Sequence, residues 1–274
     1  MTTPATLPNG VFEAGGILDR IVAAKAGRLE ETKRRLPLAR LAKPTGGNTR
    51  SLAAALRRSD RVNIIAEIKQ RSPSKGIICE DFDPVRIAAS YANGGAAALS
   101  VLCEEDFFGG SLDHLETIRN QVELPLLRKD FIFDEYQIYE SASAGADAVL
   151  LIVAILGDEL LARLMGLATD VGLQALVEVH TADEMGRAAQ AGASIIGVNN
   201  RDLTTFNVDL ETSVRMAALA QGGAILVSES GIHNGQDIRR LKPAGFSGFL
   251  VGEHLMRASN PGDALAQLIA EASA

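Results

Sequence analysis

The sequence has 274 residues, of which 47% are hydrophobic and 4% aromatic, with no Trp and a net charge of -7. This charge argues against nucleic acid as a bulk partner, but it leaves room for a small anionic ligand at a locally positive site. No run of about 18 apolar residues predicts a membrane span, and Cys79 and Cys103 fit neither a metal motif nor a disulfide framework. Because residues 1–10 lack a signal-peptide pattern, we expect a cytoplasmic protein.

The first 60 residues are predicted to form a helical extension. Helical patterns cover residues 16–28, 30–35 and 51–57, and a Pro- and Gly-containing breaker at 43–48 divides them. The extension either caps one end of the main body or packs against its outer helices, and the sequence leaves both possibilities open. We expect one domain over residues 1–274.

Apolar runs alternate with helical patterns along the rest of the chain. Most segments between the runs place apolar residues at helical spacing, and such alternation is typical of parallel strands joined by right-handed crossovers. Eight repeats favour a closed (β/α)8 TIM barrel over an open sheet. The expected strands are residues 62–66, 98–102, 124–127, 148–153, 175–179, 195–198, 225–227 and 248–251.

The end of the first expected strand carries Glu67 and Lys69, two residues apart. Alternate residues of a strand point the same way, so we expect both side chains on one side. Charge at the end of a buried strand is costly unless it is paired or used, and the carboxyl ends of barrel strands are where barrel enzymes place their chemistry.

Other expected strands also end in polar residues. Lys129 follows the third strand, where a solvent-exposed loop lysine is the alternative to a functional one. Glu178 has apolar neighbours, so it is either paired with a lysine or a proton-transfer group with a shifted pKa. We interpret Arg201 and Asp202 as a local ion pair that fixes a loop. His180 and His254 are interpreted as rim residues, and nothing resembles a metal site.

Two glycines predict an anion site. Gly231 and Gly252 lie where the last two strands turn into loops, and in barrels these loops often bind phosphate through backbone N–H groups. Ser72, on the first loop, approaches the eighth strand once a barrel closes. Simple turn glycines are the alternative interpretation.

Taken together, these motifs resemble the indole-3-glycerol phosphate synthase family. The matching segments occur in the family's order over nearly all of residues 65–256. They are Ala66-Glu67-Ile68-Lys69, Ser72-Pro73-Ser74-Lys75-Gly76, Phe107-Phe108-Gly109-Gly110-Ser111, Arg128-Lys129-Asp130-Phe131, Val177-Glu178-Val179, Asn199-Asn200-Arg201-Asp202, Glu229-Ser230-Gly231-Ile232 and Val251-Gly252-Glu253.

The resemblance implies a reaction and its catalytic groups. The ring of 1-(2-carboxyphenylamino)-1-deoxyribulose 5-phosphate closes, with loss of carbon dioxide and water, to give indole-3-glycerol phosphate. Lys129 would protonate the ketone oxygen, Glu178 would act as base or acid in the dehydration, Lys69 would assist, and Glu67 would position Lys69. A lysine near other cations can have a lowered pKa and release its proton, so we expect that situation for Lys129.

The resemblance also implies binding roles. Substrate contacts are expected from Asn199, Arg201, Glu229 and Ser230, contacts to the aromatic ring from Phe108 and Phe131, and phosphate contacts from Ser72, Gly231, Gly252 and the backbone of Glu253. Because loss of carbon dioxide restores aromaticity, no cofactor or metal is expected. The expected partner is a small phosphorylated substrate, with no nucleic acid and no membrane.

Several points stay open at this level. Cys103 and His254 depart from the family's usual residues, and we expect Cys103 to alter the ring pocket slightly. The alternatives are another phosphate-binding barrel isomerase and a barrel that binds a phosphorylated ligand without reacting. The sequence does not distinguish a monomer from a weak dimer.

Overall fold

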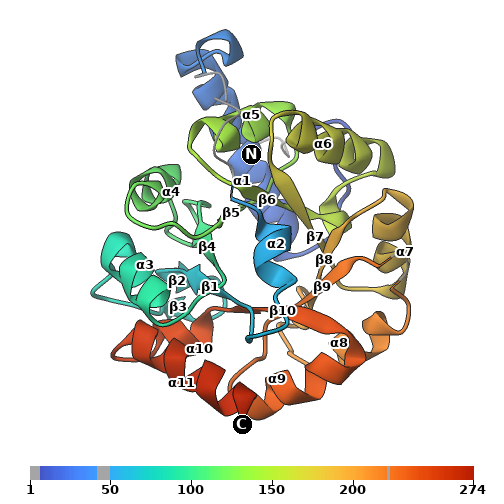
Figure 1. Ribbon diagram of the computed structural model, residues 1–274. Coiled ribbons are helices and arrows are strands. Elements are labelled where there is room, and N and C mark those ends of the chain that lie inside the picture. The colour runs from blue at the N-terminus through green and yellow to red at the C-terminus, as the bar shows by residue number, and fades with distance from the viewer. Residues whose placement is uncertain (1–6, 42–49, 221–222) are drawn as a thin grey trace.

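Eight parallel strands close into a barrel in the computed structural model, which describes residues 7–41, 50–220 and 223–274. Around the barrel the strand order is β1-β10-β9-β8-β7-β6-β5-β4, so the predicted TIM barrel is confirmed (Figure 1). The strands are β1 (Ile64–Ile68), β4 (Ala98–Leu102), β5 (Leu126–Lys129), β6 (Ala148–Ile152), β7 (Gln174–Val179), β8 (Ile195–Asn199), β9 (Ile225–Glu229) and β10 (Phe246–Val251).

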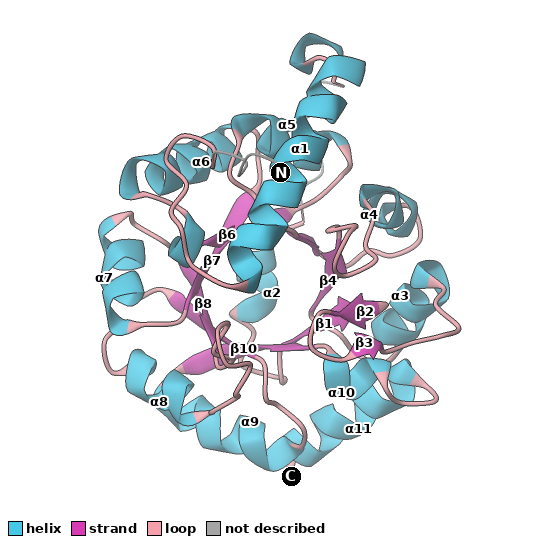
Figure 2. Cartoon of the chain, turned by 180° about the vertical axis from the view of Figure 1, so that it is seen from behind, coloured by secondary structure: helices cyan, strands magenta, loops and turns pink. Residues whose placement is uncertain are grey.

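Helices cover the outside of the barrel (Figures 1 and 2). Between and after the strands they are α3 (Pro84–Asn93), α4 (Leu112–Arg119), α5 (Glu135–Ser143), α6 (Asp158–Asp170), α7 (Ala182–Gln190), α8 (Glu211–Ala217), α9 (Gly235–Leu241), α10 (Glu253–Met256) and α11 (Pro261–Ser273), with the 3₁₀ turns η2 (Val153–Ile155) and η3 (Lys242–Ala244). Polar residues start many of them: the side chain of Asp134 caps α5, and Gln137 completes a capping box.

Some elements differ from the expectation. The loop after β1 contains a short antiparallel pair, β2 (Arg71–Ser72) and β3 (Gly76–Ile77), which the sequence did not predict. The third strand is shifted by two residues, so Lys129 ends the strand and does not follow it. Pro125 explains the later start, because proline cannot donate to a central strand ladder.

The N-terminal segment reaches both ends of the barrel. The helix α1 (Ile17–Arg35) is continuous where two helices were expected, and it lies across the mouth of the barrel in Figure 2. After a 3₁₀ turn η1 (Leu38–Arg40), α2 (Leu52–Leu56) lies over the opposite end, in front of the barrel in Figure 1. The predicted breaker at 43–48 lies outside the described residues.

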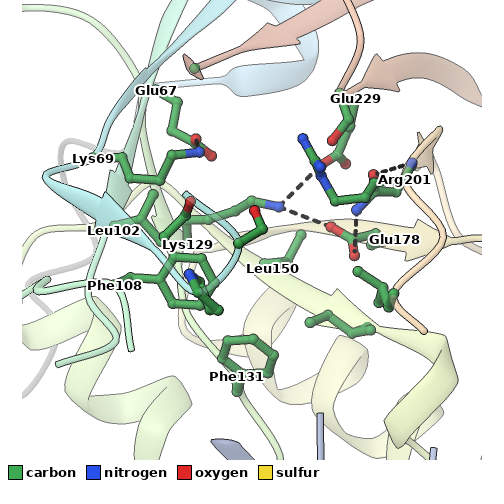
Figure 3. Close-up of a pocket in the computed structure, with 18 of the residues that line it drawn as sticks. Glu67, Lys69, Leu102, Phe108, Lys129, Phe131, Leu150, Glu178, Arg201 and Glu229 are labelled. Carbon is green, nitrogen blue, oxygen red and sulfur yellow. Dashed lines mark hydrogen bonds and ion pairs between the residues drawn. The ribbon is translucent and has the colours of Figure 1, made fainter. Parts of the chain in front are cut away.

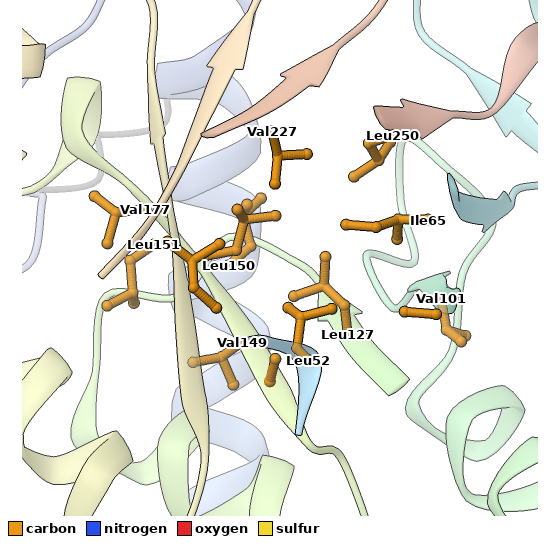
Figure 4. Close-up of a cluster of buried hydrophobic side chains, with 14 of the residues drawn as sticks. Leu52, Ile65, Val101, Leu127, Val149, Leu150, Leu151, Val177, Val227 and Leu250 are labelled. Atoms are coloured by element: carbon orange, nitrogen blue, oxygen red, sulfur yellow. The ribbon is translucent and has the colours of Figure 1, made fainter. Parts of the chain in front are cut away.

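Aliphatic side chains fill the barrel interior, as Figure 4 shows for part of the core. Leu127, Leu150 and Leu250 come from three different strands, and Leu52 of α2 joins the same cluster. This packing makes the barrel a solid core, so a ligand can enter only above the strand ends. In the part of the chain that the structure describes, no helix is long and apolar enough to cross a membrane.

A buried carboxylate fastens the end of the barrel opposite the mouth. Asp147 is fully buried. Its carboxylate accepts hydrogen bonds from two guanidinium nitrogens of Arg119 (2.6 and 3.1 Å) and from the backbone N–H groups of Arg50 and Leu126. Asp147→Ala is expected to lower the free energy of unfolding by about 3 kcal/mol, because it removes the buried carboxylate that pairs with Arg119 and accepts from two backbone amides. Denaturant unfolding measures this loss. The exposed Asp170→Ala is the control, and a loss below about 1 kcal/mol for Asp147→Ala would contradict the assignment.

Candidate active site

A pocket lies at the carboxyl ends of the strands, where charged side chains meet an apolar wall (Figure 3). Thirteen of the fourteen sequence-predicted site residues line it: Glu67, Lys69, Ser72, Phe108, Lys129, Phe131, Glu178, Asn199, Arg201, Glu229, Ser230, Gly252 and Glu253. The fourteenth, Gly231, lines a smaller cavity that shares Arg201, Gly252 and Glu253 with this pocket. The structure therefore brings the predicted set together.

Lys129 points between two carboxylates at the centre of the pocket (Figure 3). Its Nζ lies 2.9 Å from Oε2 of Glu178 and 3.0 Å from Oε2 of Glu229. Glu178 also accepts from the Asn199 amide at 3.3 Å. Glu178 and Glu229 are buried and Lys129 is largely buried, so their charges interact strongly.

The electrostatics of Lys129 differ from the expectation. Burial would lower the pKa of its ammonium, but Glu178, Glu229 and Glu67 outweigh burial and raise the pKa well above its ordinary value. The expected lowering of this pKa by neighbouring cations is therefore wrong, because the nearest charged partners are carboxylates. Lys129 is held protonated, as a proton donor must be.

The pKa values of the two carboxylates beside Lys129 are shifted in opposite directions. Burial opposes ionisation of Glu178, but Lys129, helped by His180 and Asn199, lowers its pKa to about 2. For Glu229, burial and the nearby charge of Glu178 outweigh Lys129 and raise the pKa to about 7. Pairs of titratable groups with pKa values set apart are typical of acid–base sites.

A glycine makes room for Glu229. A Cβ built on Gly197, in the neighbouring strand β8, would collide with Oε1 of Glu229. Gly197→Ala should therefore displace this carboxylate from Lys129. We expect kcat to fall by about tenfold, because Lys129 loses one of the two carboxylates that position it. Gly186→Ala on α7, where a Cβ meets open space, is the matched control. Equal steady-state rates for both variants would show that the Glu229 position does not matter.

Glu67 and Lys69 line the pocket from β1 and the turn after it, and their side chains form an ion pair, as strand alternation predicted. Gly252 lies beside them, and a Cβ there would collide with the Glu67 carboxylate. The glycine that was predicted as a phosphate contact thus also provides space for this pair.

An apolar wall faces the charged groups. The rings of Phe108 and Phe131 lie 6.2 Å apart, and Leu102 and Leu150 lie near them in Figure 3. Helix α1 completes this wall with Ile17, Leu18 and Ile21. Helix α1 therefore acts as a cap over the mouth, which decides between the two possibilities left open for the extension.

The loop that presents Phe108 is fixed by Glu104. This fully buried carboxylate accepts the backbone N–H groups of Asp106, Phe107 and Phe108 at 2.8–3.0 Å. Cys103, which was expected to affect the ring pocket, is buried and donates to the Val101 carbonyl, and it is not among the lining residues.

The loops after β9 and β10 form the polar end of the pocket. Ser230 and Gly231 have φ angles of 65° and 82°, an unusual conformation for serine, and Gly252 precedes the short helix α10. Arg201 reaches this end, 3.8 Å from a carboxylate oxygen of Glu253. The smaller cavity continues past Gly231 to His233 and His254. Local strain of this kind is often retained at ligand sites.

One expectation for the rim was wrong. Asp202 does not pair with Arg201: it accepts the backbone N–H groups of Thr204 and Thr205, which fixes the loop in another way. His180, which was interpreted as a rim residue, directly follows β7, and its ring packs against Glu178 with Nε2 3.4 Å from Oε1. In the described ranges no group of three His, Cys, Asp or Glu side chains is placed to bind a metal ion.

Sequence reasoning also missed contributors that carry no charge. Gly197 makes room for Glu229, which depends on the position of the neighbouring strand β9. The apolar residues of α1 line the pocket, which depends on the position of the helix over the mouth of the barrel. For α1, the apolar face of an amphipathic helix was a signal, but it did not indicate what the face covers.

The fold and site together define a phosphate-ligand (β/α)8 barrel enzyme with an acid–base centre. The family model described as "Indole-3-glycerol phosphate synthase" matches residues 18–268. The chain belongs to the indole-3-glycerol phosphate synthase family.

Curated relatives agree with this family. The indole-3-glycerol phosphate synthase of Carboxydothermus hydrogenoformans is 44% identical over 262 residues, which cover 92% of this chain and 99% of the relative. That of Roseiflexus sp. is 49% identical over 252 residues, covering 88% and 94%.

Solved structures show the fold alone. A 3-hexulose-6-phosphate synthase structure superposes with a TM-score of 0.62 at 15% identity, covering 76% of this chain and 99% of the other. A thiamine phosphate pyrophosphorylase from Pyrococcus furiosus superposes with a TM-score of 0.55 at 18% identity, covering 76% and 93%.

Proposed function

We propose that the pocket above the strands is the active site for the activity of the chain, which is indole-3-glycerol phosphate synthesis in tryptophan biosynthesis. The substrate is 1-(2-carboxyphenylamino)-1-deoxyribulose 5-phosphate, and the reaction is a carboxy-lyase reaction with ring closure and loss of water. The observation that carries the proposal is the meeting of Lys129 and Glu178 over one pocket that has an apolar wall on one side and glycine-lined loops on the other.

In ring closure, Lys129 protonates the substrate ketone oxygen as the ring carbon attacks the ketone carbon. The raised pKa of Lys129 suits this task, because an alkoxide developing on that oxygen is a far stronger base than the two carboxylates that hold the ammonium. Lys69 assists by binding the substrate carboxylate or moving a proton, and Glu67 positions Lys69.

Loss of carbon dioxide restores the aromatic ring, and dehydration follows. Glu178 takes the ring-carbon proton as the hydroxyl leaves with a proton of its own. The low pKa of Glu178 supports the role of base, since the group is ionised throughout the neutral range. Asn199, Arg201, Glu229 and Ser230 hold the sugar portion in place.

The two ends of the pocket orient the substrate. Phe108 and Phe131 contact the aromatic ring, and Ser72, Gly231, Gly252 and the Glu253 backbone bind the phosphate. A phosphate bound away from the reacting carbons supplies binding energy that orients them. We also propose a single domain with residues 1–60 as an N-terminal helical extension, a monomer or weak dimer, and a cytoplasmic location.

A steady-state assay with this substrate, followed by indole fluorescence, tests the proposal. The wild-type chain should form indole-3-glycerol phosphate, and the same compound without its phosphate should react with kcat/KM lower by at least about 100-fold. No product from the wild-type chain would refute the function. Equal kcat/KM for the two compounds would refute the phosphate anchor.

A further inference from the structure

His180 connects the proposed base to the rim of the barrel. It follows β7 directly, its side chain is only 12% exposed, and it lies between two carboxylates. Its Nε2 lies 3.4 Å from Oε1 of Glu178, and its Nδ1 lies 3.3 Å from Oε2 of Glu184 on α7. The backbone N–H of His180 donates to the same Glu184 oxygen at 2.8 Å, which fixes the orientation of Glu184.

One ring nitrogen is left without a hydrogen bond. When Nδ1–H donates to Glu184, the unprotonated Nε2 faces Oε1 of Glu178, so two acceptors oppose each other, and Nε2 has no hydrogen-bond partner. A proton between them resolves the opposition, because imidazolium donates to both carboxylates. The geometry is that of a place for one transferable proton.

The charged groups around the ring favour the protonated form of His180. Glu178 faces it from β7, Glu184 from α7, Glu229 from β9 and Asp202 from the loop after β8, while Lys129 lies beyond Glu178. Burial would lower the pKa of His180, but the hydrogen bond to Glu184 and the charges of Glu178, Glu184 and Glu229 outweigh burial and raise it.

The reaction needs a proton from water in every turnover. A substrate with an ionised carboxylate gives neutral carbon dioxide, so one proton must be taken up. The ketone oxygen receives one proton, the leaving hydroxyl receives a second, and the base removes one from carbon. The acid–base centre therefore ends each turnover one proton short.

We propose that His180 is a positioning residue that holds Glu178 and relays the replacement proton from Glu184 at the rim to the Glu178–Lys129 pair. In the relay, the His180 imidazolium releases its Nε2 proton to Oε1 of Glu178, and Glu178 hands that proton to the deprotonated Lys129, with which it shares a hydrogen bond. The ring proton left on Nδ1 moves to Nε2 by tautomer exchange. Glu184 takes a proton from water and passes it to the vacant Nδ1, which leaves Glu178 ionised and both Lys129 and His180 charged again. This inference rests on the proposed function.

Replacing His180 tests the relay. His180→Ala should lower kcat by about tenfold with KM changed by less than about twofold, since the relay acts after binding. Imidazole added at constant pH and ionic strength should restore part of that kcat in a saturable manner, because it can occupy the vacated space and carry the proton. His180→Gln fills the space without a transferable proton, so it should show the loss without the rescue.

Controls separate the possible outcomes. His114→Gln on α4, away from the pocket, should keep the wild-type rate, and imidazole should not stimulate the wild-type chain. Glu184→Gln, which changes only the rim end, should lower kcat at unchanged KM and covers the case that His180 variants do not fold. Wild-type rates in His180→Ala and Glu184→Gln, a change in KM alone, or a loss that imidazole does not restore would each overturn the relay. A wild-type chain without synthase activity would instead refute the proposed function.

Discussion

Replacing Lys129 by alanine is expected to lower kcat by at least about 100-fold while KM changes much less. Lys129 is the cation that the structure places between Glu178 and Glu229, within 3.0 Å of both. Without it the ketone oxygen loses its assigned proton donor in the transition state, and positioned acids contribute about 10²–10⁴-fold. The loss falls on kcat because substrate binding depends mainly on the phosphate and the aromatic ring.

The measurement is the fluorescence assay of indole-3-glycerol phosphate formation at saturating substrate. Lys129→Arg is a useful companion, because it keeps the positive charge between the carboxylates but donates its proton far less readily. If Lys129→Ala kept near-normal turnover, the assignment of the acid would be wrong. If Lys129→Arg were fully active, Lys129 would act through its charge alone.

Removing the carboxylate of Glu178 is expected to have an effect of the same size. Glu178→Ala should lose at least about 100-fold in kcat, because it removes the ionised carboxylate that takes the proton in the proposed dehydration. Glu178→Gln keeps the size of the side chain and its contact with Asn199, so an equal loss in that variant would identify the charge as the cause.

The pKa of Glu178 gives this prediction a pH dependence. Because the folded protein lowers that pKa to about 2, the base stays ionised from neutral pH down to about pH 4, and its protonation should not limit kcat/KM in that range. Glu229, with a pKa of about 7, does titrate near neutrality. A limb of the wild-type kcat/KM profile near pH 7 that disappears in Glu229→Gln would assign the limb to Glu229. Its persistence would assign it to another group.

The sequence predicted the barrel because its cues are local. Alternating apolar runs and helical patterns define eight repeats, and strand alternation correctly placed Glu67 and Lys69 together. Closure of the barrel then explains why polar residues from distant segments share one mouth. The pairing of Lys129 with Glu178 spans 49 positions and needs that closure.

What the sequence could not predict depends on contacts across strands and on exact strand ends. The close approach of Gly197 to the Glu229 carboxylate exists only once β9 lies beside β8. His180 was interpreted as a rim residue because sequence does not show which way a ring turns after a strand. Whether the pKa of Lys129 is raised or lowered depends on whether carboxylates or cations lie nearest, and only the folded site supplies that information.

The attachment of helix α1 limits how the mouth can open. Lys25, only 5% exposed, places its Nζ 2.8 Å from Asp130, the residue after Lys129, and 3.0 Å from Glu105. Asp130 in turn binds Arg128, which is buried against Glu140 of α5. Lifting α1 as a unit would separate these buried charges from their partners at a cost of about 3 kcal/mol or more. At that cost, fewer than about one molecule in a hundred would have the helix lifted. We therefore expect substrate to enter and product to leave past the loops after β1 and β8, which also line the pocket, while helix α1 stays attached.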